Sequence, residues 1–194
     1  MWYKKIFRLL LILLMPLGCV VLVFTFIKTQ VNPVVNAHYY SLPFAKGETH
    51  KVVQGYGGLF SHNHLAALDF EMKEGTSIYA ARGGVIYAYS DIFTEGGILP
   101  EYKSKANYVI IEHNDGTYGC YWHLQHNGVV IKQGNVIQGQ LIGYSGSTGY
   151  VLNAHLHFSV KRVLNYTKEA YVQTKFVTSN GLEILQQNCS YTNP

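Results

Sequence analysis

The 194-residue chain contains few cysteines, only Cys19, Cys120 and Cys189. They are too scattered for a structural zinc site, which uses closely paired cysteines. Cys120 and Cys189 either form one disulfide in an oxidising compartment or remain free thiols, and their spacing leaves both alternatives open. The chain also lacks internal repeats and low-complexity tracts. Its length corresponds to one domain plus a targeting segment.

Acidic residues are absent before Glu48, whereas Lys4, Lys5, Arg8 and Lys28 surround the first apolar run. These four basic residues account for the formal net charge of +4, since the remainder carries eleven basic and eleven acidic side chains. A nucleic-acid-binding domain concentrates basic charge on its own surface. We therefore expect no nucleic-acid partner.

The apolar run extends from Leu9 to Ile27 without a charged residue. This length approaches the ~20 residues that a helix needs to cross a bilayer. Basic residues precede the run, so the N-terminus is expected in the cytoplasm and the remainder outside it. We expect a membrane anchor, or a signal sequence, over residues 1–28 and a linker over residues 29–41.

Two alternatives to an uncleaved anchor stay open. Signal cleavage near Val35–Ala37 would fall well beyond an apolar run that is already longer than a usual signal core. Lipidation at Cys19 would require a large aliphatic residue where Pro16 stands. Each alternative also delivers the domain outside the cytoplasm, and the anchor is the favoured hypothesis.

From Leu42 onward, apolar and polar residues alternate and turn signals recur about every 8–12 residues, which predicts a mostly β, antiparallel domain. The domain is expected over residues 42–165, with a C-terminal extension over residues 166–194 that packs on it or trails from it. Asn114-Asp115-Gly116 predicts a hairpin turn, and Asp91–Ala106 predicts a long loop of the kind that often carries function. The expected strands are His50–Gly55, Ala66–Glu71, Ser77–Ala80, Gly84–Ser90, Tyr108–His113, Thr117–Leu124 and His155–Arg162.

The placement of the histidines indicates a metal site. His155 and His157 alternate within an expected strand, so both rings project from the same face. Asp69 stands in an apolar run, where an unpaired carboxylate is costly and a metal partner would compensate it. Two histidines and one carboxylate with an open fourth position form a catalytic zinc shell. Histidines and an aspartate that only hydrogen-bond in the core remain the alternative.

The order of motifs from about Leu42 to Arg162 resembles the lysostaphin-like zinc metallopeptidases, bacterial endopeptidases that cut peptide stems or cross-links of peptidoglycan. The motifs are Gln54-Gly55-Tyr56, Phe60-Ser61-His62, Ala67-Leu68-Asp69-Phe70, Gly75-Thr76, Ala80-Ala81-Arg82, Gly84-Val85, Asn107–His113, Asp115-Gly116-Thr117, Tyr121-Trp122-His123-Leu124, Gly139-Gln140, Ser145–Gly149 and His155-Leu156-His157-Phe158.

The resemblance implies roles for individual residues. His62, Asp69 and His157 fall where that family places its zinc ligands. His123 and His155 fall where it places two further histidines that assist catalysis. The implied chemistry is zinc-assisted hydrolysis of a peptide bond, in which either histidine takes up the proton.

The chain departs from the family pattern at two places. The gap between the first histidine and Asp69 is longer than in many members, which makes His64 a rival to His62 as the first ligand. We favour His62, because Phe60-Ser61 resembles a subgroup in which this gap is longer and variable. Asn153-Ala154 replaces a glycine–proline pair before His155, which changes the groove and removes no ligand.

The sequence thus predicts a zinc metalloendopeptidase, a single-pass protein of a bacterial inner membrane whose catalytic domain lies in the periplasm or outside the cell. Its expected partners are the peptide of peptidoglycan and the membrane. An inactive scaffold of the same fold, which binds and activates other cell-wall hydrolases, is the main alternative. A peptidase acting on a glycine-rich exported protein is another. Because candidates for all five site residues are present, activity is favoured.

Overall fold

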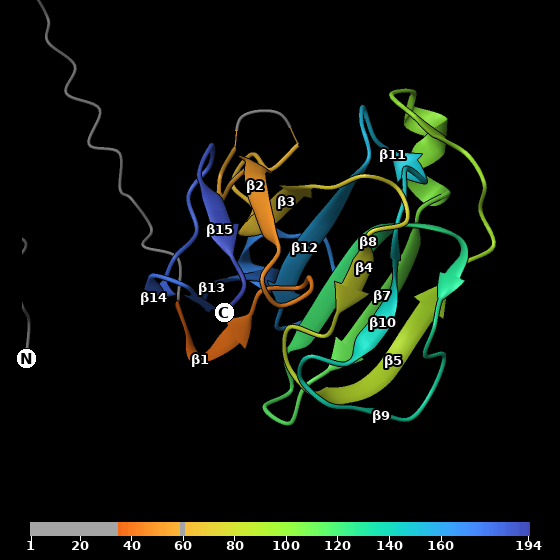
Figure 1. Ribbon diagram of the computed structural model, residues 1–194. Helices are drawn as coiled ribbons and strands as arrows, with labels where there is room; N and C mark the ends of the chain where they lie inside the picture. The colour runs from red at the N-terminus through yellow and green to blue at the C-terminus, as the bar shows by residue number, and fades with distance from the viewer. Residues whose placement is uncertain (1–34, 59–60) are drawn as a thin grey trace, which may run out of the picture. The chain divides into compact units, whose positions relative to one another are not determined.

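A computed structural model describes residues 35–58 and 61–194 of the chain (Figure 1). The expected anchor over residues 1–28, with Cys19, lies outside the described residues, as do residues 29–34 of the expected linker. Within the described ranges, no helix has the length and apolar character needed to cross a bilayer. The membrane span expected over Leu9–Ile27 therefore stays a prediction.

The described residues form strands and two short 3-10 helices. The strands are β1 (Val35–Ser41), β2 (Thr49–Gln54), β3 (Ala67–Glu71), β4 (Ser77–Tyr79), β5 (Gly84–Ser90), β6 (Gly96–Gly97), β7 (Asn107–Glu112), β8 (Tyr118–Val129), β9 (Asn135–Val136), β10 (Leu141–Ser145), β11 (Gly149–Tyr150), β12 (His155–Lys161), β13 (Tyr171–Thr178), β14 (Gly181–Glu183) and β15 (Ser190–Thr192), and the helices are η1 (Pro100–Ser104) and η2 (Lys168–Ala170).

The expected mostly antiparallel β fold is confirmed. The main sheet has the order β15-β2-β3-β12-β8-β7-β5-β9, and its neighbouring strands are antiparallel throughout. Parallel pairing in the described part of the chain is limited to β1 with β13 and β6 with β11. The turn predicted at Asn114–Gly116 joins β7 to β8, with Gly116 at a φ of 77°. Glycine adopts this left-handed conformation without steric cost.

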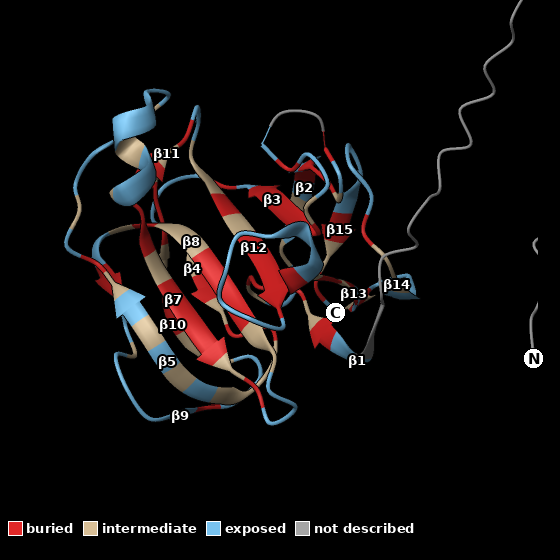
Figure 2. Ribbon diagram, turned by 180° about the vertical axis from the view of Figure 1, so that it is seen from behind, coloured by how far each residue is buried: buried red, intermediate tan, exposed pale blue. Residues whose placement is uncertain are grey.

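Alternation along β3 and β12 separates the core from the opposite face of the sheet. Leu156 pairs with Phe70 and Phe158 with Leu68, and all four are buried. Figure 2 shows β3 and much of β12 in the colour of buried residues. Each such side chain contributes about 1.5–3 kcal/mol by leaving water. A slip of one residue would expose this entire set, so burial fixes the register. The same register aligns Asp69 with His157 on the other face.

Segments on both sides of residues 42–165 belong to the sheet system. Residues 35–41, expected as the end of a linker, form β1, which pairs with β13. Tyr40 in β1 is fully buried, with its ring 6.3 Å from that of Phe158 and 6.1 Å from that of Phe176. At the other end of the chain, β15 pairs with β2. Long-range packing of this kind has no local sequence signal.

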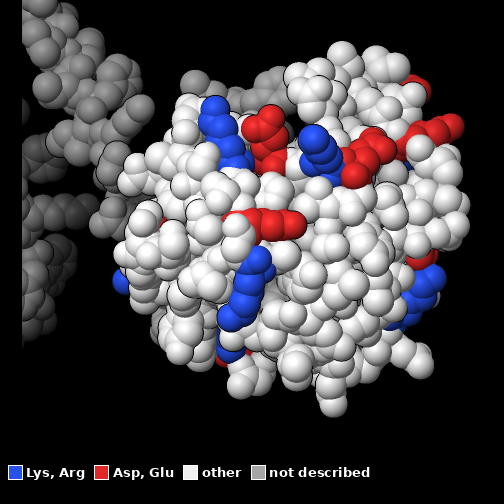
Figure 3. Space-filling model, in the orientation of Figure 1, with Lys and Arg blue, Asp and Glu red and all other residues white. Residues whose placement is uncertain are grey.

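The expected loop over Asp91–Ala106 contains β6 and η1 and docks through β6 onto β11. The approach is close enough to require glycine, because a Cβ on Gly96 would lie 1.7 Å from the Ser147 carbonyl oxygen. Cys120 is a buried free thiol and Cys189 an exposed one, so they form no disulfide. On the face shown in Figure 3, acidic and basic side chains lie interspersed, which produces no extended field of one sign.

Candidate metal and catalytic site

Three potential metal ligands converge where β3 and β12 lie side by side. Asp69 Oδ1 lies 3.1 Å from His62 Nε2 and 2.8 Å from His157 Nδ1, and the two nitrogens are 3.1 Å apart. Ligand atoms on a tetrahedral zinc with bonds of about 2.0–2.1 Å are separated by about 3.3 Å. The donor types and the size of this triangle therefore fit a zinc ion.

Neighbouring groups orient these three side chains and influence their protonation. His62 is fully buried and its Nδ1–H donates to the Gly55 carbonyl at 3.1 Å, which leaves Nε2 with its lone pair toward the cluster. Burial raises the pKa of Asp69, but the close contacts with the His157 and His62 imidazoles outweigh this effect and hold the pKa below its usual range. Burial lowers the pKa of His157 despite its contact with Asp69. The site thus presents an anionic oxygen beside the imidazole nitrogens of His62 and His157.

The geometry distinguishes the two candidates for the first ligand. His62 contributes an atom to the triangle, whereas His64 is exposed and contributes none. The chain turns sharply between them, with a hydrogen bond from Leu65 N to His62 O and a φ of 65° at His64. This arrangement favours His62 as the first ligand, in agreement with the preference drawn from the Phe60-Ser61 motif.

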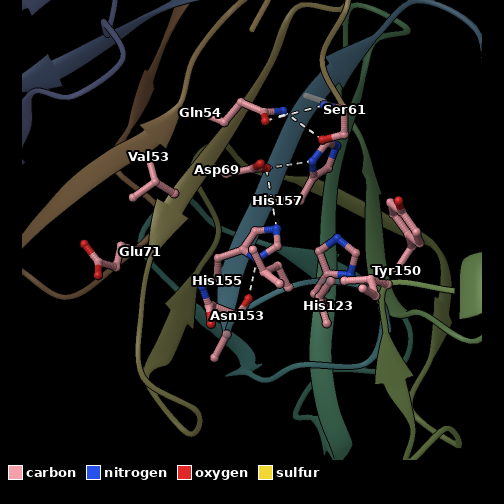
Figure 4. Close-up of a pocket in the computed structure, with 14 residues that line it drawn as sticks. Val53, Gln54, Ser61, Asp69, Glu71, His123, Tyr150, Asn153, His155 and His157 are labelled. Carbon is pink, nitrogen blue, oxygen red and sulfur yellow. Dashed lines mark hydrogen bonds and ion pairs between the residues drawn. The ribbon is translucent and has the colours of Figure 1, made fainter. Parts of the chain in front are cut away.

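The two further histidines stand next to the triangle with matching hydrogen bonds. His123 Nδ1 lies 2.7 Å from the Thr148 carbonyl and His155 Nδ1 lies 2.7 Å from the Asn153 carbonyl. Because a carbonyl can only accept, each Nδ1 carries a proton, so the neutral form of each ring has its lone pair on Nε2. The two rings are 4.7 Å apart, and His155 Nε2 lies 3.7 Å from Asp69 Oδ1. All five expected site residues are thus brought together, and Figure 4 shows four of them, Asp69, His123, His155 and His157.

His123 reaches the site through an irregularity in β8. Leu124 pairs with Asn107 and Trp122 with Tyr108, so His123 is an extra residue with no partner on β7. Its φ of 67° is left-handed, an uncommon conformation for a residue with a side chain. In a regular strand, Trp122 and His123 would project from opposite faces of the sheet. The bulge breaks this alternation at His123.

Burial controls the protonation of His123. Desolvation, followed by the repulsion of nearby His155 and His157, lowers the pKa of His123 to about 3. The imidazole is consequently neutral at pH 7 and its Nε2 is able to accept a proton. Backbone strain and a displaced pKa at one residue are typical of functional sites.

A cleft surrounds the histidines, and several of its lining residues were not singled out from the sequence (Figure 4). Gln54 Nε2 donates to Ser61 Oγ at 2.8 Å beside the metal triangle. Ile98, from the long loop, and Leu152 line another part of the cleft and are largely exposed. The only sequence signal for this wall was the length of the loop over residues 91–106.

Comparison with known proteins shows the family. The model of peptidase family M23 matches residues 63–173, more than half of the chain. The chain belongs to peptidase family M23. This confirms the resemblance to lysostaphin-like peptidases. M23 peptidases are zinc-dependent hydrolases of peptidoglycan, in agreement with the donor set found here.

Individual M23 relatives cover part of the chain. The peptidoglycan DD-endopeptidase ShyA of Vibrio cholerae is 34% identical over 93 residues, which is 47% of this chain and 19% of ShyA. Lysostaphin of Staphylococcus simulans is 33% identical over 116 residues, which is 57% of this chain and 21% of lysostaphin. The chain thus matches about a fifth of the length of these relatives.

A solved structure extends the similarity of fold. The M23 metalloprotease pseudoalterin from the deep sea superimposes with a TM-score of 0.50 at 16% identity, covering 81% of this chain and 96% of pseudoalterin. At this identity the similarity concerns the fold alone. It includes a larger share of the chain than the family model does.

Proposed function

We propose that this M23 chain is a zinc-dependent endopeptidase that hydrolyses peptide bonds in the stems or cross-links of peptidoglycan outside the cytoplasm. The observation that carries the proposal is the triangle of His62, Asp69 and His157 beside two histidines whose Nδ1 atoms are held by backbone carbonyls. The names of the relatives support the substrate class, since they include a peptidoglycan DD-endopeptidase and a glycyl-glycine endopeptidase.

The residues divide the chemical work. His62, Asp69 and His157 would hold zinc, which when bound provides a nucleophilic water near neutral pH and polarises the scissile carbonyl. His123 or His155 would accept a proton at Nε2 and return it to the leaving amine. Their Nδ1 hydrogen bonds to backbone carbonyls fix each ring and its tautomer during this transfer. The apolar side chains of the cleft would restrict water around the peptide.

The presence of all five side chains favours an enzyme over an inactive scaffold. Purified full-length protein is expected to contain about one zinc ion per chain and to release cleaved muropeptides from purified peptidoglycan, measured by mass spectrometry. Chelation and His157→Ala should each abolish release. Equal release by the metal-free protein would contradict the zinc-dependent mechanism, whereas no release by the zinc-loaded protein would contradict the hydrolase proposal and favour the scaffold. Cleavage of a glycine-rich protein instead of peptidoglycan would show that the substrate is an exported protein.

A pair of histidine variants tests the first ligand. His62→Ala is expected to weaken zinc binding by more than about 100-fold. This exceeds the loss of about 10–100-fold that is typical when a residue hydrogen-bonded to a metal ligand is replaced. His64→Ala should leave zinc affinity unchanged, because this side chain is exposed and outside the cluster. Competition titration with a zinc chelator measures both. The assignment is wrong if His64→Ala produces the larger loss.

The location outside the cytoplasm is a proposal that rests on the N-terminal sequence. Protein extracted from the membrane fraction is expected to have the intact mass of the whole 21.8 kDa chain, because an uncleaved anchor retains residues 1–28. A mass reduced by about the N-terminal 37 residues would indicate signal cleavage. A chain that begins at Cys19 with added acyl mass would indicate lipidation.

A further inference from the structure

The cleft extends past His155 to a carboxylate that the proposed chemistry does not use. Glu71 follows Asp69 by two residues on β3, so both project from the same face, about 6–7 Å apart along the strand. Glu71 pairs with His155 across the sheet and lines the cleft. Figure 4 shows Glu71 beside Val53 on one side of the histidines, with Tyr150 on the other side.

The Glu71 carboxylate has no counter-charge in this cleft. Among the described residues that line it, the acids are Asp69 and Glu71, and no lysine or arginine is present. Asp69 is engaged by histidines. His50 contacts the Glu71 backbone rather than its carboxylate, with Nδ1 donating to the carbonyl at 2.9 Å, and its Nε2 lies 3.3 Å from Glu48. Glu71 therefore presents an unneutralised negative charge to whatever occupies the cleft.

Val53 supplies an apolar surface next to this charge. Its side chain is 38% exposed and lines the same cleft. An apolar patch next to a carboxylate suits a side chain with a hydrocarbon stem and a cationic end, since such side chains lie along apolar surface and keep the charged group at a polar partner. A peptide backbone alone would use neither feature.

We propose that Glu71 and Val53 form a subsite for the side chain of a diamino acid in the substrate peptide, with the ammonium group on Glu71 and the alkyl stem on Val53. The inference rests on the proposed peptidase function and names a substrate feature at that site. Glu71 lies on the side of His155 that faces away from His123. We therefore assign it a role in specificity and not in catalysis. Stem peptides of peptidoglycan contain a diamino acid whose side-chain amine is free where no cross-link is attached.

The test uses two fluorescent stem peptides that differ only in the side-chain amine, which is free in one and N-acetylated in the other. The zinc-loaded full chain is expected to bind the free-amine peptide about three- to fivefold more tightly, the range of an exposed ion pair. The preference should decline as salt screens the pair. Glu71→Gln should bind both peptides equally. Glu169→Gln, which removes an exposed carboxylate on η2, is the matched control and should keep the preference.

Two results would overturn the subsite. The first is equal affinity of the wild type for both peptides, including the absence of measurable binding of either. The second is an undiminished preference in Glu71→Gln, because the acetyl group would then act by its size. Failure of the peptidase proposal looks different, since the free-amine peptide would bind preferentially while mass spectrometry detected no cleaved product.

Discussion

Replacing His123 by alanine is expected to lower kcat for peptide hydrolysis by about 100- to 10,000-fold, the usual contribution of a general acid–base group. The reason is its position: a neutral imidazole with its Nδ1–H held by Thr148 and its ring 4.7 Å from that of His155. His123 is not part of the metal triangle, so zinc content should stay unchanged. Steady-state kinetics and metal analysis on the same preparation measure the two quantities.

The control for this variant is His126→Ala, which removes an exposed histidine from the same strand. It should retain full activity and full zinc content. If His123→Ala keeps more than about a tenth of the wild-type kcat, His155 would be the main proton carrier. Loss of zinc from His123→Ala would instead show that His123 supports the metal and would contradict the division of roles proposed here.

The second large effect concerns stability and involves His113, a buried histidine away from the cleft. Desolvation lowers the pKa of His113 to about 4, although its Nδ1–H donates to the Gly83 carbonyl at 2.9 Å. Its Nε2 is buried without a hydrogen-bond partner among the described residues, so a proton there would have no acceptor. The unfolded chain takes up this proton near pH 6.5 and the folded chain only near pH 4.

Stability should therefore be complete above about pH 6.5 and fall as the pH decreases to about 4, because the unfolded state binds more protons in this window. The loss from His113 amounts to roughly 3 kcal/mol. His113→Asn retains an N–H donor near the Nδ1 position and does not titrate. Denaturant unfolding at pH 7 and pH 4 should show a smaller loss in the variant by that amount. An equal loss in both proteins would refute the assignment.

Local patterns anticipated much of the sheet. The seven strands expected from alternation correspond to β2, β3, β4, β5, β7, β8 and β12, mostly within one residue at their ends. Alternation works here because burial on one face selects every second side chain. β1 and β15 were not expected, since each is defined by pairing with a strand far away in the sequence. Residues 35–41 and 190–192 therefore had no local signal for their place in the sheet.

The sequence by itself determined which chemical groups are available: His62, Asp69, His123, His155 and His157, in an order typical of M23 peptidases. It also determined that His155 and His157 share a face, because a strand alternates side chains with a period of two.

Tertiary structure alone decided which groups meet. The turn after His62 and the register of β3 with β12 bring His62 rather than His64 to Asp69. The bulge at His123 directs that ring into the cleft. The juxtaposition of Glu71 with Val53 likewise arises between separate strands. These features depend on single backbone dihedrals and on contacts between distant segments, which residue spacing along the chain does not specify.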